Sequence, residues 1–386
     1  MKTKGGEAML VGMDGKRAVE NNTGLGNYSR YALNMMSMDF PGTRFRLYAP
    51  REKSNDRLDP LLARENVDIS YARTSFGAAG RALWRTVDMP VTLGNDGVSV
   101  YHGLSNELPL TIGRVCPSVV TIHDIIYRRC PEDYTAIDRR LYDFKYSRSA
   151  RIATRVIAIS ECTRRDLISD YQISPDKIDV IYQGIDPVFT LEIPTVKRQE
   201  IRAKYGLPET YIACVGTVQP RKNQLLAVRA LAKLPAGVKL VIVGRMSGDY
   251  GAKVKSEIAR LGLADRVMHL EGIPFADIPA IYADAVLSVY PSRYEGFGLP
   301  VVESITVGTP VIAATGSCLE EAGGDGAVYI NPDDADALAC EALHIIDDRI
   351  FRDKLVRHGQ RHVKKFSADN FAKATMAAYN KAILAF

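Results

Sequence analysis

Residues 211–234, YIACVGTVQPRKNQLLAVRALAKL, join an apolar run to a helical pattern through a polar loop. The run YIACV is apolar throughout, which is typical of a strand that is buried on both faces of a parallel sheet. The segment NQLLAVRALAKL repeats apolar residues at helical spacing. A buried strand followed by such a helix is the repeating element of an α/β fold.

The same alternation continues through the second half of the chain. Further apolar runs are VKLVIVG, VMHLEG, AVLSVYP, PVIAAT and AVYINP, and the helical patterns between them are GAKVKSEIARLG, ADIPAIYADA, LPVVESITVG and SCLEEAG. After residue 337 the chain is mostly helical, and Ser367 is a candidate N-cap of the last helix. This half predicts a doubly wound parallel sheet.

The first half repeats this pattern less regularly. Its strand candidates are AMLVGMD, RFRLYAP, VDISYA, VSVYHGL, SVVTIHD, RVIAIS and KIDVIYQG, and helices are expected after GLGN and ISEC. Residues 187–200 hold two prolines and no periodic pattern, so we expect the linker there. We predict an α/β protein of two Rossmann-like domains, 1–190 and 191–386, facing a central cleft, with the last helix a candidate to pack back onto the first domain.

Composition excludes several classes of protein. Charged residues make up 25% of the 386 residues and the net charge is only +5, which argues against a nucleic-acid binder. The six cysteines are scattered, so neither a disulfide framework nor a metal site is expected. The chain start has no long apolar region and no run is long enough to span a bilayer, so we expect a cytoplasmic protein.

The loop GTVQPRKN follows the strand YIACV at the edge of the sheet where ligands of such folds bind. If Asn223 caps the next helix, Arg221 and Lys222 lie at its positive end, which is electrostatically unfavourable. An anion bound between these cations and the helix N–H groups would reverse that effect. A solvated basic turn is the equal alternative.

The stretch PSRYEGFGLPVVES, residues 291–304, places two glutamates in an apolar neighbourhood. Pro300 fits the first helical position, so Glu303 falls near the end of the first turn. A buried carboxylate needs partners, and ribose hydroxyls, backbone groups or cations are suitable donors. Glu303 alone is equally explained by the helix dipole, whereas the pair Glu295 and Glu303 is not.

With these motifs assembled, the chain resembles the retaining glycosyltransferases of family 4 (glycosyl transferases group 1), which have the GT-B fold. It is most similar to bacterial mannosyltransferase-like members that build surface polysaccharides such as lipopolysaccharide. The resemblance is carried, in order, by TGLGNYSRY, TIHDIIYRRCPEDY, VIAISECTRRDL with IYQGID, GTVQPRKN, and EGFGLPVVES with its E-x7-E spacing.

The resemblance implies roles for individual residues. Arg221 and Lys222 would grip the donor diphosphate, Glu303 would accept hydrogen bonds from the ribose, and Glu295 would hold sugar hydroxyls. His123 would lie near the reacting centre, although a histidine that ends an apolar strand is often a satisfied core residue. The other implied binding residues are Gly24, Leu25, Gly26, Gly216, Gly296, Phe297, Gly298 and Leu299.

The implied substrates are a nucleotide-sugar donor, with GDP-mannose favoured over UDP-glucose, UDP-galactose and a rhamnose donor, and a saccharide or lipid-linked saccharide acceptor. No metal cofactor is expected, because Asp334 and Asp336 in DAD are better explained by helix capping. Six basic residues between Arg139 and Arg155 suggest contact with anionic lipid or a solvated helix face. A nucleotide-sugar epimerase and a catalytically silent sugar-nucleotide-binding protein are the alternatives.

Overall fold

The computed structural model describes residues 8–72, 77, 80 and 83–386, and it forms two compact units. The first unit consists of the chain up to Tyr127, then Tyr134–Gly184, then Ala368–Phe386. The second consists of Arg128–Asp133 and Ile185–Ser367. Residues 1–7, which belong to the chain start discussed above, lie outside the described residues.

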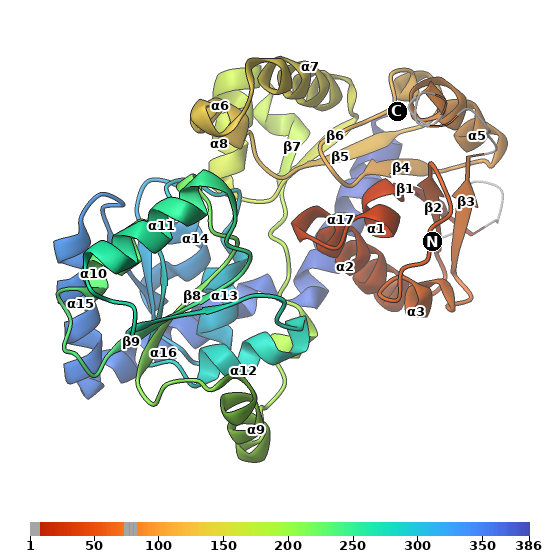
Figure 1. The fold of residues 1–386 in the computed structure, drawn as a ribbon. Coiled ribbons are helices and arrows are strands. Elements are labelled where there is room, and N and C mark those ends of the chain that lie inside the picture. Colours follow the sequence, from red (N-terminus) through yellow and green to blue (C-terminus); the bar gives the residue numbers. More distant parts are fainter. Residues whose placement is uncertain (1–7, 73–76, 78–79, 81–82) are drawn as a thin grey trace. The chain divides into compact units, whose positions relative to one another are not determined.

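The first unit is built on a parallel sheet with the strand order β3-β2-β1-β4-β5-β6-β7 (Figure 1). The strands are β1 (Leu10–Asp14), β2 (Arg44–Ala49), β3 (Val67–Tyr71), β4 (Val100–Gly103), β5 (Ser118–Ile122), β6 (Arg155–Ala158) and β7 (Ile178–Val180). The side chains of β1 and β5 are buried throughout, as expected for strands covered on both faces.

The longer helices of this unit are α2 (Gly24–Asp39), α7 (Ala136–Ile152), α8 (Glu161–Tyr171) and α17 (Ala368–Leu384), and the shorter ones are α1 (Lys16–Glu20), α3 (Asp59–Leu62) and α5 (Met89–Asn95). The short helix α6 (Ile126–Arg129) begins in this unit and ends in the second. Ser160 caps α8, because its hydroxyl accepts from the Thr163 amide at 3.0 Å. The C-terminal α17, blue in Figure 1, lies against α2, and Phe371 and Tyr379 are buried in the same core as Tyr28.

The second unit has a parallel sheet with the order β10-β9-β8-β11-β12-β13. Its strands are β8 (Tyr211–Val215), β9 (Lys239–Val243), β10 (Val267–Leu270), β11 (Leu287–Tyr290), β12 (Val311–Ala314) and β13 (Ala327–Ile330). Its helices are α9 (Thr195–Tyr205), α10 (Gln224–Leu231), α11 (Gly248–Arg260), α12 (Ile278–Ala283), α13 (Leu299–Thr306), α14 (Leu319–Gly323), α15 (Ala335–Asp347) and α16 (Arg349–His362).

The two parallel sheets confirm the predicted α/β class, and each apolar run interpreted as a strand forms one. Two local expectations were wrong. The stretch 187–200 is not a patternless linker throughout, because α9 begins at Thr195. The residues GLGN do not form a loop before a helix, since Gly24 is the first residue of α2. In the part of the chain that the structure describes, no helix is long and apolar enough to cross a bilayer.

Candidate active site

The candidate site of the second unit lies where its sheet changes direction. From β8 the chain continues to β9 and β10 on one side, and from β11 it continues to β12 and β13 on the other. The carboxyl ends of β8 and β11 are therefore the topological switch point, where open α/β sheets bind their ligands. Arg221 and Lys222 follow β8, and Glu295 follows β11.

These three side chains form one buried cluster. The Glu295 Oε1 atom lies 2.6 Å from Arg221 Nη1 and 2.7 Å from Lys222 Nζ, and the cation side chains are only 12% and 15% exposed. The same oxygen accepts hydrogen bonds from the Tyr290 hydroxyl at 3.0 Å and from the Ser292 hydroxyl at 2.6 Å. The structure therefore does not support a solvated basic turn at Arg221 and Lys222.

The cluster keeps Glu295 ionised. Burial acts to raise the pKa of this carboxyl, but the charges of Lys222 and Arg221 and the hydrogen bonds that it accepts outweigh burial and lower the pKa to about 2. Two cations face one carboxylate, so the cluster carries a net positive charge. An anionic ligand at the switch point would meet this charge in a largely water-excluded setting.

Backbone contacts tie the loops after β8 and β11 together. The Arg221 carbonyl accepts from the Arg293 amide at 2.8 Å, and Arg221 Nη1 donates to the Tyr294 carbonyl at 2.6 Å. Arg221 and Lys222 themselves lie on a short 3₁₀ turn, Pro220–Lys222, just before α10. The two loops thus fix the positions of the two cations relative to the carboxylate.

Asn223 does not cap α10 with its side chain, contrary to the sequence expectation. It lies at the N-cap position with φ +58°, and its Nδ2 donates instead to the carbonyls of Pro291 at 3.2 Å and Pro332 at 2.7 Å. The side chain therefore links the start of α10 to the segments that follow β11 and β13. Asparagine tolerates the left-handed backbone that this position requires.

The glycine-rich turn before α13 is shaped by packing. Gly298 has φ +97°, and a Cβ atom at this residue would lie 2.5 Å from Leu319 Cδ2. Phe297 is buried and packs edge-on against Phe366, with ring centroids 5.0 Å apart. Gly296 is buried as well, whereas Leu299 is partly exposed at the first position of α13. On the neighbouring loop, the Gly216 amide donates to the Val243 carbonyl at 2.8 Å.

Glu303 lies on α13 in a different electrostatic setting. Burial and the negative charge of Asp186 raise its pKa to about 8, and Lys222 opposes them only in part. The side chain is partly exposed, and among the described residues none donates a hydrogen bond to it or pairs with it. A carboxylate in this state would gain from a ligand that donates hydroxyl groups.

The predicted residues of the first unit lie at the same edge of its own sheet. His123 follows β5, is buried, and donates from Nε2 to the Leu104 carbonyl at 2.9 Å, while its ring packs edge-on against Tyr28. Burial lowers the pKa of His123 to about 4, so the imidazole is neutral at pH 7. The Nε2 atom of His123 is therefore hydrogen-bonded, as expected for the alternative in which this histidine is a core residue.

The residues Gly24, Leu25 and Gly26 form the first turn of α2. A Cβ atom at Gly26 would lie 1.7 Å from the Asn21 carbonyl oxygen, so the backbones of α1 and α2 meet too closely for any other residue. Gly24 is exposed, and a Cβ atom there would meet no described atom within 4 Å. Packing therefore explains Gly26 but not Gly24.

Of the two aspartates in DAD, Asp334 caps a helix as the sequence predicts, whereas Asp336 does not. Asp334 caps α15, because its carboxylate accepts from the Ala337 amide at 2.8 Å, and Asp336 pairs with Lys233. Within the described ranges, no group of three or more His, Cys, Asp or Glu side chains is arranged to hold a metal ion.

Sequence reasoning missed three members of the site. Tyr290 and Ser292 donate to Glu295, and Asp186 acts on Glu303 through its charge. Tyr290 ends β11, so its position at the carboxyl end of a strand was a usable signal. Asp186 is distant in sequence from Glu303, so only the fold brings them close.

The chain matches known families over most of its length. Residues 34–189 match the model described as Glycosyltransferase Family 4, and residues 197–362 match Glycosyl transferases group 1. The O-antigen chain mannosyltransferase B of Escherichia coli is 29% identical over 72% of this chain and 74% of its own. The MMP alpha-(1->4)-mannosyltransferase of Mycolicibacterium hassiacum is 29% identical over 88% of this chain and 82% of its own.

Solved structures share the fold. HepE of Anabaena, solved in complex with UDP and glucose, has a TM-score of 0.74 at 20% identity and covers 96% of this chain and 99% of its own. The sucrose-phosphate synthase of Thermosynechococcus elongatus has a TM-score of 0.75 at 18% identity, covering 98% of this chain and 100% of its own. The chain therefore belongs to the family 4 glycosyltransferases (glycosyl transferases group 1), enzymes with the two-domain GT-B fold.

Proposed function

We propose that this glycosyltransferase moves a hexose, with mannose favoured, from a nucleoside-diphosphate sugar to a hydroxyl group of a saccharide or lipid-linked saccharide. The transfer retains the anomeric configuration and serves the biosynthesis of surface polysaccharides. The observation that carries the proposal is the buried cluster of Arg221, Lys222 and Glu295 at the switch point of the second unit.

Arg221 and Lys222 would stabilise the departing diphosphate. In glycosyl transfer the bond between the sugar and the phosphate oxygen breaks while negative charge accumulates on the diphosphate. Cations that the surrounding loops already hold in place can stabilise this negative charge without rearranging. Retention then follows either from attack of the acceptor on the face that the phosphate leaves, or from a short-lived covalent intermediate.

The two glutamates would hold the donor in different ways. Glu295 is ionised at any working pH and already accepts from several donors, so it suits hydrogen bonds from sugar hydroxyls rather than proton transfer. Glu303 has no described partner, and ribose hydroxyls would provide the donors that its carboxylate lacks. The nearby turn Gly296–Leu299 and Gly216 would contribute backbone groups.

The first unit would bind the acceptor. His123 is neutral, and its Nδ1 atom keeps an acceptor lone pair because Nε2 carries the proton that bonds Leu104. The start of α2 would let a substrate approach the backbone closely at the exposed Gly24, beside the partly exposed Leu25.

Replacing Lys222 by alanine tests the proposal. We expect the rate of sugar transfer to fall on the order of 10²–10³-fold, because one fixed cation at the leaving group is lost. The matched control is Lys233→Ala, which removes a lysine paired with Asp336 outside the cluster and should leave the rate unchanged. Near-normal turnover in a folded Lys222→Ala protein would contradict the diphosphate assignment.

The donor is tested by ligand-induced stabilisation. GDP-mannose is favoured because two relatives are named mannosyltransferases, although HepE was solved with UDP. A thermal-shift panel of GDP, UDP, dTDP and ADP with their sugars should single out GDP and GDP-mannose, since a ligand at 100 times its Kd stabilises by about 2.7 kcal/mol. Incubation with donor alone should give no epimer, because transfer requires an acceptor.

We propose that the reaction needs no metal ion, because Arg221 and Lys222 supply the positive charge at the diphosphate. Transfer should continue at full rate in EDTA. Loss of activity in EDTA that is restored by Mg²⁺ or Mn²⁺ would refute this part of the proposal.

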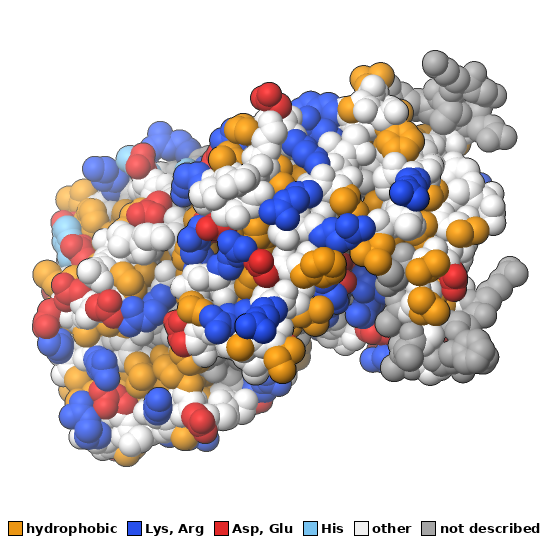
Figure 2. Space-filling view, turned by 90° about the horizontal axis from the view of Figure 1, so that it is seen from above, with side chains coloured by type: hydrophobic (Ala, Val, Ile, Leu, Met, Phe, Trp, Pro, Cys, Tyr) orange, Lys and Arg blue, Asp and Glu red, His pale blue; other side chains and the backbone are white. Residues whose placement is uncertain are grey.

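We also propose a cytoplasmic enzyme with peripheral contact at the membrane through α7. Three apolar side chains on this helix are exposed, Ile137, Leu141 and Phe144, and their spacing places them on one face. Seen from above, Figure 2 shows apolar side chains interspersed with basic ones. Of the basic residues counted in the sequence, Lys145 pairs with Glu107 and Arg155 with Asp179, which leaves fewer for a lipid surface.

Sedimentation with vesicles of anionic phospholipid tests the membrane contact. The protein should co-pellet at physiological salt, and the double variant Ile137→Ser, Arg140→Gln should co-pellet less. A wild-type protein that stays in the supernatant would remove this contact from the proposal.

A further inference from the structure

The hydroxyl group of Tyr290 lies between two charged groups of the candidate site and contacts both. Tyr290 ends β11 and is only 5% exposed. Its hydroxyl accepts a hydrogen bond from Lys222 Nζ and donates to Glu295 Oε1 at 3.0 Å. The groups involved determine both directions, because an ammonium only donates, an ionised carboxylate only accepts, and a phenol has one proton to donate. Tyr290 therefore links the cation to the carboxylate through a single oxygen atom.

Two of the three N–H groups of the Lys222 ammonium are used inside the cluster. One donates to Tyr290, and Nζ lies 2.7 Å from Glu295 Oε1. Among the described residues no further acceptor is bonded to this ammonium, so its third N–H group remains for a ligand. The N–H bonds of an ammonium point to the corners of a tetrahedron, so two fixed directions also fix the third. Tyr290 and Glu295 together thus set the direction in which Lys222 can donate to a ligand.

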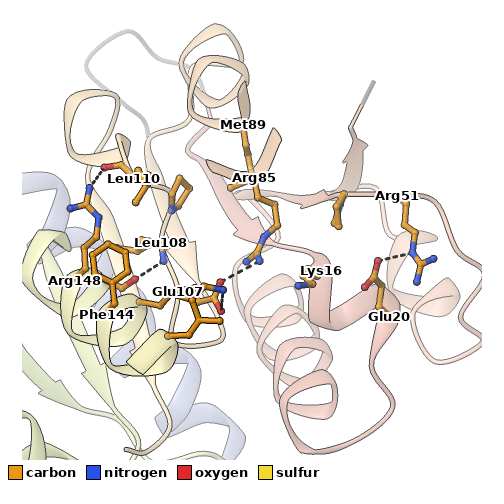
Figure 3. A pocket seen from close by; sticks show the side chains of 15 residues that line it. Lys16, Glu20, Arg51, Arg85, Met89, Glu107, Leu108, Leu110, Phe144 and Arg148 are labelled. Carbon is orange, nitrogen blue, oxygen red and sulfur yellow. Dashed lines mark hydrogen bonds and ion pairs between the residues drawn. The ribbon is translucent and has the colours of Figure 1, made fainter. Parts of the chain in front are cut away.

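A second carboxylate of the molecule lies between an arginine and a lysine and allows a comparison. Glu107 lines a pocket of about 550 Å³ in the first unit, where Figure 3 shows it joined to Arg85. It lies 3.4 Å from Arg85 and 3.4 Å from Lys145, whereas the two cations at Glu295 lie at 2.6 and 2.7 Å. No hydroxyl group in the described ranges donates to Glu107, and the Lys145 side chain is 39% exposed, compared with 15% for Lys222. The lysine that is held tightly is thus the one with a hydroxyl anchor.

The direction of a donor matters for charge that appears during a reaction. A lysine ammonium ends a flexible stem of four carbons and can rotate, so a lysine without anchors must reorient as charge develops. In the proposed transfer, negative charge accumulates on the diphosphate while the bond to the sugar breaks. An N–H group that already points at this charge stabilises it without reorientation.

We propose that Tyr290 is a positioning residue for sugar transfer: its hydroxyl, held between Lys222 and Glu295, orients the Lys222 ammonium toward the phosphate from which the sugar departs. The inference rests on the proposed function and deepens it, because it gives a neutral, buried side chain a part in stabilising the leaving group.

Binding of GDP and GDP-mannose to Tyr290→Phe tests the proposal, because the two ligands differ at the phosphate in question. At pH 8 the terminal phosphate of GDP carries more negative charge than the same phosphate in GDP-mannose, where the sugar is attached to it. GDP therefore resembles the leaving group after the bond has broken. Calorimetric titration should show that the variant binds GDP about tenfold more weakly than the wild type, the effect of one oriented hydrogen bond. GDP-mannose binding should weaken by less than about threefold, since its phosphate carries less charge for the oriented N–H group to stabilise. Unchanged GDP binding, or equal weakening for both ligands, would overturn the proposal.

A double-mutant cycle shows whether Tyr290 acts through Lys222. In a protein that already carries Lys222→Ala, the further change Tyr290→Phe should alter GDP binding by less than about twofold, because no ammonium is left to orient. A merely structural role of the hydroxyl would weaken GDP binding equally in both backgrounds. Such additive effects would overturn the proposal.

The matched control is Tyr211→Phe, which removes another buried tyrosine hydroxyl from the same sheet. Tyr211 begins β8, and its hydroxyl donates to the Ile281 carbonyl at 2.7 Å, outside the cluster. This variant should bind both ligands like the wild type, and urea unfolding shows whether both variants are folded. GDP binding as weak in Tyr211→Phe as in Tyr290→Phe would overturn the proposal. A Tyr290→Phe protein that fails to fold where Tyr211→Phe folds would do the same, because it would make the Tyr290 hydroxyl a structural group.

The outcome is separable from that of the proposed function. UDP and UDP-glucose are titrated beside the guanosine ligands, so the base of the donor does not decide the result. If the wild type binds a nucleoside diphosphate through Lys222 and Tyr290→Phe binds it unchanged, the positioning role falls and the proposed function stands. If the wild type binds neither nucleoside diphosphate, or Lys222→Ala binds them as tightly as the wild type, the diphosphate assignment falls and the positioning role falls with it.

Discussion

At the scale of single residues, Glu303 should make the stability of the protein depend on pH. Its pKa of about 8 in the folded chain lies above the ordinary carboxyl value of 4.5. Between these values the folded chain keeps a proton that the unfolded chain has released. The contribution of Glu303 to the free energy of unfolding therefore falls as pH rises from about 4.5 to 8 and is constant on either side.

Glu303→Gln should remove this pH dependence. The variant should gain stability relative to the wild type as pH rises across the window, on the order of 1–3 kcal/mol, since one pKa unit is about 1.4 kcal/mol and the side chain is partly exposed. Urea unfolding at intervals from pH 4.5 to 8.5 measures the difference. Parallel stability curves for the two proteins would show that the carboxyl titrates normally.

Nucleotide binding should release a proton from the same residue. Ribose hydroxyls that donate to Glu303 favour its ionised form, so binding at pH 7 converts a mostly protonated carboxyl into a carboxylate. Calorimetric titration with GDP in buffers of different ionisation enthalpy counts the protons released. Glu303→Gln serves as the control that removes this release, and an equal proton count in the variant would place the ribose elsewhere.

At the scale of secondary-structure elements, Asn223 joins three segments of the second unit. Its backbone turns from the 3₁₀ turn into α10 with positive φ, and its amide holds two carbonyls beyond β11 and β13. Both Asn223→Gly and Asn223→Ala should lower the free energy of unfolding by about 1–2 kcal/mol through the lost hydrogen bonds.

The two Asn223 variants should differ from each other. Alanine should cost about 1 kcal/mol more than glycine, because only glycine adopts the left-handed backbone freely. Urea unfolding of both proteins at one pH makes the comparison. Equal stabilities would mean that the backbone conformation of this residue is not under strain.

The elements differ in how far the sequence predicts them. The strands follow from their apolar runs, because a strand buried on both faces has no polar positions to obscure it. Helix α9 was missed because Ile201 is its only buried residue, so it shows little periodicity. It is held instead by Arg198 and Arg202, which pair with Asp284 at 2.6 and 3.1 Å. Such tertiary ion pairs leave no local signal.

The sequence predicts where in the fold the candidate site lies, but not which of its side chains form ion pairs with one another. The sequence places Arg221, Lys222 and Glu295 after strands. The alternation of strands and helices therefore predicts that these residues lie at one edge of the sheet. It does not show that β8 and β11 are neighbours, which depends on the strand order. The mutual ion pairs, and the donation from Tyr290 and Ser292, follow only from that adjacency.

At the scale of the whole molecule, the first unit depends on the last helix of the chain. Tyr379 on α17 bonds the buried His102 through its hydroxyl, 2.7 Å from Nδ1, and His102 Nε2 lies 2.8 Å from Thr121 Oγ1. Tyr28 completes the network at 3.1 Å from the same Thr121 atom. Without α17 this unit would expose its apolar core and leave a buried imidazole without one partner.

Apart from the short segment 128–133, the chain passes from the first unit to the second after residue 184 and returns after residue 367, and these two crossings lie side by side. The Ile185 amide donates to the Phe366 carbonyl at 3.1 Å. The segment that enters the second unit at Ile185 is therefore hydrogen-bonded to the segment that leaves it after Ser367. A short glycine–serine linker can therefore join residue 184 to residue 368. The first unit together with residues 128–133, and the remainder of the second unit, can then be produced as separate proteins.

We expect fragment 1–184 to be unfolded or insoluble, and the same fragment linked to residues 368–386 to fold, because only the second contains the helix that completes the core. Fragment 185–367 should fold alone and bind nucleoside diphosphate, since it keeps the complete β8–β13 sheet with Arg221, Lys222, Glu295 and Glu303. Circular dichroism and urea unfolding compare the fragments, and thermal shift with GDP and UDP tests ligand binding.

A linker-joined protein in which Tyr379→Phe lowers stability by about 1 kcal/mol or more would show that α17 docks as in the full chain. Cooperative unfolding of fragment 1–184 at the stability of the joined protein would contradict the dependence on α17.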